Sequence, residues 1–162
     1  MNIRTATITD ISTLSRIAID SVTPHKDTDF NDEGWKRFLS SSSFASTLYR
    51  LTNSQYKCFC CTQDSETIGF IIIRELEKID QLFVLPSAQR RGVARALWEH
   101  AKHECLMLKQ PLRFWVRSSA PAVPVYRRFG FIEDGGPQTE HGIGFQLMRL
   151  KCPCNFKTAS KI

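Results

Sequence analysis

The stretch that decides the fold is "QLFVLPSAQRRGVARALWEHA", residues 81–101. An apolar run typical of a β-strand ends at a proline, and a helix with an apolar stripe begins a few residues later. Two arginines and a glycine stand at the start of that helix, where the macrodipole already places positive charge. Further positive charge there does not stabilise a helix, but an anion bound at the same place would. The stretch therefore predicts an anion-binding site between a strand and a helix.

The segment "QRRGVA", residues 89–94, is suited to a pyrophosphate. The first N–H groups of a helix have no partner within the helix. Gly92 has no side chain and lets an oxygen approach the backbone, while Ala94 keeps the next turn small. Arg90 and Arg91 add mobile positive charge. Neither a P-loop signature nor a GxGxxG motif occurs, and a tight turn with two solvated arginines is the alternative interpretation.

Length and charge limit the class of protein. The chain has 162 residues and a net charge of +6, and we expect one domain over residues 1–150 followed by a polar tail at 151–162. Much of the positive excess falls between Arg74 and Arg128, which favours one anionic site. No apolar run approaches the roughly 20 residues that span a bilayer. The first residues lack the apolar core of a signal peptide, so we expect a cytoplasmic protein without a membrane partner.

The chain has six cysteines, and without a secretion signal we expect them to be reduced. Cys105 falls on the apolar face of the helix that follows "QRRGVA", where a free cysteine acts as a small hydrophobe. Cys152 and Cys154 are too close together for the usual zinc knuckle, and no paired histidine motif follows them. We therefore expect no metal.

Hydrophobic periodicity predicts an alternation of helices and strands. The N-terminal part should hold a strand at 3–8, a helix capped by Asp10, a loop at 22–33, a short helix around 35–39, and a turn or helix at 44–51. The rest should hold strands at 55–61, 67–74 and 78–85, a helix at 91–108, a buried strand at 112–116, a short helix at 122–128, the segment "FGFIED" and a last strand at 144–150. The apolar stripe of the long helix comprises Val93, Ala94, Leu97, Trp98, Ala101, Cys105 and Leu108, with Arg95 facing outward. Because a helix connects the strands at 78–85 and 112–116, these two should be parallel.

Two motifs in this order resemble those of the GNAT superfamily of acetyl-CoA-dependent N-acyltransferases. "LFVLP" at 82–86, followed by "QRRGVA" at 89–94, is similar to the family's most diagnostic segment. In "SAPAVPVYRRFGF", Ser119, Ala122 and Tyr126 fall on a second family pattern. Ser119 stands where many relatives carry Asn, and Ala94 where many carry Gly. The resemblance covers roughly residues 3–150.

The resemblance implies an α/β (α+β) fold with a mixed, mostly antiparallel twisted sheet flanked by helices. Two central parallel strands, 78–85 and 112–116, would splay apart, and acetyl-CoA would enter the gap as co-substrate. Its pantetheine arm would pair like an added strand with Leu82, Phe83 and Val84, and Ser119 would hydrogen-bond it. The pyrophosphate would lie on the backbone and side chains of Gln89, Arg90, Arg91, Gly92, Val93 and Ala94. An N–H near Leu82 or Phe83 would stabilise the oxyanion.

Tyr126 is the candidate general acid, because the matching tyrosine in the family lies near the coenzyme sulfur and can protonate the leaving thiolate. A packed tyrosine at a helix end is the alternative. The first candidate for the general base is Asp80, with Glu77, Glu140, His141 or a water chain as alternatives. No Cys or Ser has a triad-like setting, so direct attack without a covalent enzyme intermediate is expected.

The acceptor pocket is expected to be built from the first helices and residues 22–39. His25, Phe30 and Trp35 are candidate lining residues. The acidic residues Asp27, Asp29, Asp32 and Glu33 could attract a cationic amine, although such charge runs are often only solvated. The sequence leaves open whether the amine belongs to an amino acid, a polyamine, an antibiotic or a protein N-terminus. It also leaves a homodimer open.

A non-catalytic module that senses acyl-CoA or binds nucleic acid is the rival hypothesis, since the net charge of +6 suits either ligand. Aromatic residues are not interleaved with the basic residues as stacking platforms would require. No helix-turn-helix signal is present either. We therefore expect an enzyme with a small-molecule or peptide amine as its partner, and no nucleic acid.

Overall fold

The structure, a computed structural model, describes residues 1–109 and 111–152. Its eight-stranded sheet has the order β1-β2-β3-β4-β5-β8-β6, and β7 pairs with β8 beside it. The strands are β1 (Asn2–Thr5), β2 (Tyr56–Gln63), β3 (Glu66–Arg74), β4 (Lys78–Val84), β5 (Arg113–Ser118), β6 (Ile132–Glu133), β7 (Gln138–Glu140) and β8 (Ile143–Lys151). The α-helices are α1 (Ile11–Val22), α2 (Lys26–Asp29), α3 (Asp32–Ser41), α4 (Phe44–Thr52), α5 (Val93–Leu108) and α6 (Val123–Arg128). Every strand pair is antiparallel except β4–β5, which confirms the predicted mixed, mostly antiparallel sheet.

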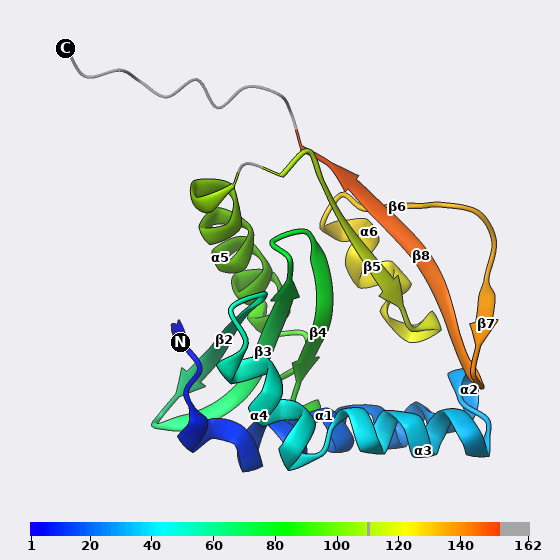
Figure 1. Ribbon diagram of the computed structural model, residues 1–162, viewed down its shortest axis with the longest axis horizontal. Helices are drawn as coiled ribbons and strands as arrows, with labels where there is room; N and C mark the ends of the chain where they lie inside the picture. Colours follow the sequence, from blue (N-terminus) through cyan, green and yellow to red (C-terminus); the bar gives the residue numbers. More distant parts are fainter. Residues whose placement is uncertain (110, 153–162) are drawn as a thin grey trace.

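The parallel strands β4 and β5 pair only at the N-terminal end of β4. Their register has two Cα pairs, Lys78–Trp115 and Ile79–Val116. Beyond them the two strands separate, as Figure 1 shows, and leave a gap in the middle of the sheet. A bulge accompanies the separation, because the register between β3 and β4 shifts and makes Asp80 an extra residue in β4. A bulge bends a strand and increases its twist, so it favours this divergence. The predicted splayed strands are confirmed.

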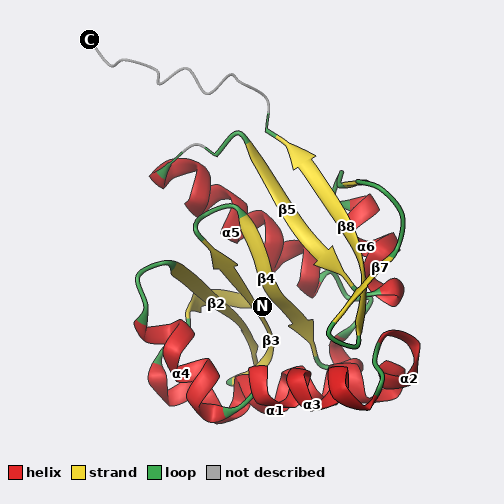
Figure 2. Ribbon diagram, turned by 45° about the vertical axis from the view of Figure 1, so that its right-hand side comes forward, coloured by secondary structure: helices red, strands yellow, loops and turns green. Residues whose placement is uncertain are grey.

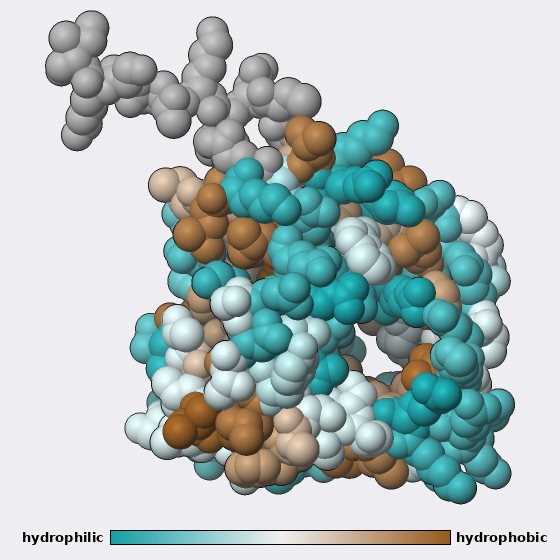
Figure 3. Space-filling view, viewed as in Figure 1, coloured by the Kyte–Doolittle hydropathy of each residue, from teal (hydrophilic) through white to brown (hydrophobic). Residues whose placement is uncertain are grey.

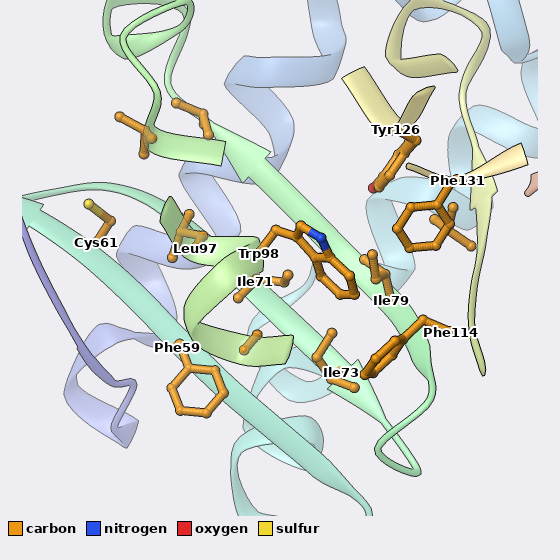
Figure 4. Close-up of a cluster of buried hydrophobic side chains, with 14 of the residues drawn as sticks. Phe59, Cys61, Ile71, Ile73, Ile79, Leu97, Trp98, Phe114, Tyr126 and Phe131 are labelled. Atoms are coloured by element: carbon orange, nitrogen blue, oxygen red, sulfur yellow. The ribbon is translucent and has the colours of Figure 1, made fainter. Parts of the chain in front are cut away.

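Alternating side chains give the sheet two buried faces. In β3, Ile71 and Ile73 pack on the side of α5 and α6, while Phe70 and Ile72 pack on the side of α1 and α3. Figure 4 shows the first of these clusters, in which Trp98 of α5 lies among the side chains of the neighbouring strands. Figure 2 shows α1 and α3 lying along the lower edge of the molecule, near the open end of the gap. The two cores thus hold β4 rigidly while its neighbour β5 diverges.

The predicted start of the chain needs correction. The first strand ends at Thr5 rather than residue 8, because Ile8–Asp10 form a turn of 3₁₀-helix. Asp10 precedes α1, but its side chain does not cap that helix. Its carboxylate instead accepts hydrogen bonds from the Thr7 N–H and the Arg4 guanidinium, both at 2.8 Å. The Arg4 contact lowers the pKa of the Asp10 carboxyl.

The loop predicted at 22–33 is wrong, since this segment contains a 3₁₀ turn (Thr23–His25), α2 and the start of α3. Helix α3 begins there because Asn31 is its N-cap. The Asn31 side chain accepts a hydrogen bond from the Gly34 N–H at 2.9 Å. One turn-forming residue of this segment, Asn31, therefore serves as a helix cap, while the 3₁₀ turn and α2 begin without a side-chain cap.

Smaller differences lie at the ends of elements. Leu108 was predicted on the apolar stripe of α5 but is 60% exposed, and Leu112, predicted at the start of a buried strand, is 76% exposed. Both lie where the chain leaves the core. Strand β7 was not predicted; the turn from β7 to β8 has positive φ at His141 and Gly142, as a two-residue type I′ hairpin requires. Of the predicted tail, residue 151 belongs to β8, and 153–162 lie outside the described residues.

No helix of the described residues is long and apolar enough to span a bilayer.

The segment 29–31 reaches across the open end of the gap and contacts the other half of the sheet. We call this segment and its three contacts the clasp. The Asp29 carboxylate accepts a hydrogen bond from the Ala120 N–H at 2.9 Å, and Phe30 forms a β-bridge with Ile143. The Asn31 N–H donates to the Gly142 carbonyl at 3.0 Å. The clasp therefore joins the helical N-terminal half to β8 and to the segment after β5.

The clasp requires glycine on both sides. A Cβ atom added to Gly34 would overlap the Gly142 carbonyl, and one added to Gly142 would overlap the Asn31 side chain. In each case the obstacle is close to the backbone, so neither clash is easily relieved.

Gly34→Ala tests this packing. Helix propensity alone would stabilise the variant by about 1 kcal/mol. We expect instead a loss of roughly 2 kcal/mol in the free energy of unfolding, because overpacking must displace the β8 turn. Urea denaturation measures the change. Gly136→Ala is the control, since a Cβ there meets nothing within 4 Å. Equal or greater stability of Gly34→Ala would show that the clasp is loose.

Candidate functional site

A cavity of about 1110 Å³ fills the gap between β4 and β5. Figure 3 shows its opening as a hollow on the face of the molecule above α3. The walls come from β4, the start of α5, the segment from β5 to α6, the clasp and the β7–β8 turn. The cavity brings together all the predicted site residues except Arg91: Asp80, Leu82, Phe83, Val84, Gln89, Arg90, Gly92, Val93, Ala94, Ser119 and Tyr126. The Arg91 guanidinium instead donates to the side chain of Gln63 at 3.3 Å.

The edge of β4 that faces the gap presents backbone hydrogen-bonding groups. The Leu85 N–H donates to the Ile68 carbonyl of β3 at 2.9 Å. In an antiparallel ladder the paired residues alternate, so Phe83 also directs its N–H and C=O groups toward β3. The backbone groups of Leu82 and Val84 therefore face the gap. The sequence analysis gave the N–H of Leu82 or Phe83 as the donor to the oxyanion. Of these two groups, the Leu82 N–H faces the cavity.

Gln89 closes part of this edge. Its side-chain amide donates to the Val84 carbonyl at 3.1 Å, and the Ser21 hydroxyl of α1 lies 3.0 Å from the same oxygen and 2.6 Å from the Ile17 carbonyl. These contacts fix the connection between β4 and α5. A ligand running along β4 therefore meets an occupied carbonyl at Val84 and must displace Gln89 to use it.

The start of α5 leaves its first amides without partners in the helix. Gly92 is the N-cap with φ 83°, a conformation that favours glycine, and has no side chain to cap the helix. Nothing lies within 4 Å of the position that a Cβ would take. The Val93 side chain is buried in the core, while the N–H groups of Val93, Ala94 and Arg95 are available at the helix start. This open, positively polarised surface suits a diphosphate.

Two further cations at this end of the cavity were missed by the sequence analysis. Arg95 is exposed, as predicted, and it also lines the cavity together with Arg128. The Arg95 guanidinium donates to the Arg128 carbonyl at 3.0 Å and lies 5.6 Å from the centroid of the Phe129 ring. The signal in the sequence was its spacing, since Arg95 lies three residues after Gly92 and so on the first turn of the helix.

Tyr126 lies in the wall of the cavity and is 5% exposed. Its ring packs edge-on against Phe129 and Phe131, at 6.0 and 5.5 Å between centroids. Figure 4 shows its hydroxyl pointing toward β4. Burial raises the pKa of the Tyr126 hydroxyl, which therefore stays protonated at neutral pH. The side chain is placed to donate a proton into the cavity.

Three carboxylates line the cavity, and two have cationic partners. Asp80, 11% exposed at its side chain, accepts from Arg50 at 2.9 Å and from Lys78 at 3.2 Å, through different oxygens. Glu140 forms an ion pair with Arg117.

Asp29 is the third, and no ion pair to it is found among the described residues. Burial raises the pKa of its carboxyl, while the hydrogen bond from Ala120 and attraction to His25 oppose that shift.

The remaining candidates are divided between the cavity and its surroundings. His25, Phe30 and His141 line the cavity, and so do Phe38 and Phe145, which the sequence analysis did not single out. Trp35 was expected in the pocket but packs behind it, stacked on Phe38 at 5.4 Å. Besides Arg91 and Trp35, the predicted residues that do not line the cavity are Asp27, Asp32, Glu33 and Glu77.

The described cysteines lie away from the cavity. Burial raises the pKa of the Cys58 and Cys105 thiols to about 12, so neither forms a thiolate nucleophile at neutral pH. Among the residues that the structure describes, no group of three or more His, Cys, Asp or Glu side chains is arranged to hold a metal ion.

Residues 26–152 match the family model described as "Acetyltransferase (GNAT) domain". A GCN5-related N-acetyltransferase from Rhodopseudomonas palustris is similar in structure, with TM-score 0.80, 18% identity and 93% and 95% of the two chains covered. So is the PaiA N-acetyltransferase from Thermoplasma acidophilum in complex with coenzyme A, with TM-score 0.77, 18% identity and coverage of 93% and 98%. The ribosomal-protein-S18-alanine N-acetyltransferase from Escherichia coli gives TM-score 0.69, 22% identity and 96% coverage of each chain. The search of curated proteins found no match.

Gly92→Ala tests the helix start as a diphosphate site. The Cβ would occupy the open space at the first amides, and the Kd for acetyl-CoA, measured by calorimetry, should rise about tenfold or more. The left-handed backbone should also cost about 1–2 kcal/mol of stability.

Gly135→Ala is the matched control, because Gly135 also has positive φ with nothing within 4 Å but does not line the cavity. It should lose similar stability and keep its affinity for acetyl-CoA. Equal affinity in the two variants would place the diphosphate elsewhere.

Proposed function

This chain belongs to the GNAT acetyltransferase family, and we propose that it transfers the acetyl group of acetyl-CoA directly to a primary amine. One observation supports this most strongly. A single cavity joins a helix start with unpaired amides, a strand edge with unpaired backbone groups and a buried tyrosine. These are the three contacts that a diphosphate, a pantetheine amide chain and a leaving thiolate require.

The coenzyme would bind along one side of the gap. Its diphosphate would accept hydrogen bonds from the amides at the start of α5, with Arg90, Arg95 and Arg128 supplying positive charge. Its pantetheine arm would run along β4 toward Leu82, like a strand added to an unpaired edge. Ser119, across the gap on the segment after β5, would hydrogen-bond the same arm.

The transfer then needs one bond formed and one broken. The amine nitrogen attacks the thioester carbon, and the carbonyl oxygen becomes an oxyanion that the Leu82 N–H stabilises. Collapse of this intermediate breaks the C–S bond. The thiolate takes the proton of the Tyr126 hydroxyl, and the proton that the amine loses restores the tyrosine hydroxyl.

We propose that the proton of the amine leaves through water rather than directly to Asp80. Both oxygens of Asp80 already accept hydrogen bonds from cations, so a proton placed there would disrupt a buried ion pair. Asp80 would then fix the bulge of β4 against α4 through Arg50. The sequence analysis gave Asp80 as the first candidate for the general base and a water chain among the alternatives.

The wild-type protein provides the direct test. Acetyl-CoA should bind in a calorimetric titration, and a panel of amines should include at least one that releases CoA thiol. Binding without thiol release for any amine would indicate an acyl-CoA sensor instead. Absence of binding at millimolar acetyl-CoA would contradict the proposal.

Tyr126→Phe should lower kcat about a hundredfold, the usual contribution of a positioned acid. The Kd for acetyl-CoA should change little, because no described group hydrogen-bonds the hydroxyl and the ring is retained. Steady-state kinetics and calorimetry measure the two effects. Tyr49→Phe, on the exposed face of α4, is the control. An unchanged kcat in Tyr126→Phe would remove the acid assignment.

Asp80→Asn separates the two roles of that carboxylate. We expect the free energy of unfolding to fall by about 3 kcal/mol, because Arg50 and Lys78 lose their counter-ion. The kcat at saturating acceptor should fall by less than about tenfold if water carries the proton. A much larger loss of kcat at unchanged stability would restore Asp80 as the general base.

A further inference from the structure

The clasp covers the acceptor side of the cavity. Its three contacts, from Asp29 to Ala120, Phe30 to Ile143 and Asn31 to Gly142, tie one wall of the gap to the other. The glycines at 34 and 142 make this contact too close for any side chain between the two backbones. The main chain of a polypeptide therefore cannot pass between these two backbones. A small molecule needs only to enter the cavity.

In the part of the chain that the structure describes, the acceptor side of the cavity has one unpaired carboxylate and can therefore neutralise one ammonium group. Asp80 is held by Arg50 and Lys78, and Glu140 by Arg117, so both are already neutralised. Asp29 alone, among the carboxylates that line the cavity, has no cation within ion-pairing distance in the described residues. Its carboxylate accepts one backbone hydrogen bond, from Ala120, and its desolvation makes a cationic ligand favourable there.

The arginines on the acceptor side of the cavity already pair with carboxylates of the protein, so they are not free to bind a carboxylate of the acceptor. Arg37 lines the cavity but pairs with Glu33 at 3.2 Å, and Arg117 pairs with Glu140. The other titratable side chains here are His25 and His141.

The surfaces between these charges are aromatic. The four phenylalanines that line this part of the cavity are Phe30, Phe38, Phe83 and Phe145. Phe38 connects two of them, at 5.4 Å from Phe30 and 6.2 Å from Phe83 between ring centroids. Such walls favour an apolar or aromatic group on the acceptor.

From these features, and resting on the function proposed above, we infer that the acceptor is a small primary monoamine with an apolar body, and that Asp29 is the counter-ion of its ammonium group. The amine enters beneath the clasp as the ammonium ion, pairs with Asp29, and places its apolar part among the phenylalanines. The ammonium then releases one proton through water to the solvent, and the neutral nitrogen moves from Asp29 to attack the thioester. A polyamine would leave its other ammonium groups without unpaired carboxylates. An amino acid would leave its carboxylate without an unpaired cation.

An acceptor panel tests the class. We would compare 2-phenylethylamine, spermidine, L-phenylalanine and a short peptide with an N-terminal alanine by thiol release. The value of kcat/KM should be highest for 2-phenylethylamine by about tenfold, because each of the other acceptors would bring a further charged or polar group into the cavity without a partner there. Preference for spermidine, the amino acid or the peptide would overturn the inference while leaving acetyl transfer intact.

Asp29→Asn tests the residue. Asparagine keeps an oxygen for the Ala120 N–H and removes only the charge. The KM for 2-phenylethylamine should rise about tenfold, while the KM for acetyl-CoA stays within about twofold. Asp27→Asn is the matched control, because Asp27 is an exposed residue of the same helix that does not line the cavity. A loss confined to kcat, or shared by the control, would assign Asp29 to the clasp alone.

A binding measurement separates this inference from the proposed function. 2-Phenylethylamine should bind by calorimetry to the wild-type protein saturated with CoA, and its affinity should fall in Asp29→Asn but not in Asp27→Asn. Failure of the amine to bind would overturn the inference. Acetyl-CoA binding by the protein alone tests the proposed function independently.

Discussion

Strands β4 and β5 pair over only two residues each, and the rest of the structure depends on this constraint. Two Cα pairs hold the strands together, and the bulge at Asp80 turns β4 away from its neighbour. A continuous ladder would have paired the backbone groups of Leu82 and Val84 with β5. The separation instead leaves a cavity in the centre of the sheet, where both neighbouring strands are anchored by buried cores.

Contacts between the two halves keep this gap open but bounded. Arg50 holds the bulge of β4 from α4, and the clasp connects α2 and α3 to β8. These contacts add to the β4–β5 ladder and to the core in which Trp98 of α5 packs against Phe114 of β5. The geometry of the acceptor end therefore depends on the N-terminal helices as much as on the sheet. The coenzyme end depends on the local sequence that follows β4.

This division explains what could be predicted from the sequence. The strand, the proline that follows it, the glycine at the start of α5 and Tyr126 are encoded by local patterns. The structure places residues of the strand, the glycine and the tyrosine in one cavity. The contact of Asp29 with Ala120 joins residues 91 positions apart, so no local pattern reports it. The short helical turns in 22–33 were mistaken for a loop because both kinds of structure contain turn-forming residues. Arg95 was predicted to be exposed, and it is, but its place in the cavity was not predicted, because a helical stripe describes the core and not a cavity beside the helix.

The most direct measurement is a crystal structure of the protein with bound CoA. The account predicts diphosphate oxygens within hydrogen-bonding distance of the Val93 and Ala94 N–H groups at the start of α5. It also predicts the pantetheine arm between β4 and β5, with an amide hydrogen-bonded to the backbone at Leu82 and the sulfur beside the Tyr126 hydroxyl. Coenzyme bound elsewhere, with the space between the two strands filled by side chains, would contradict it.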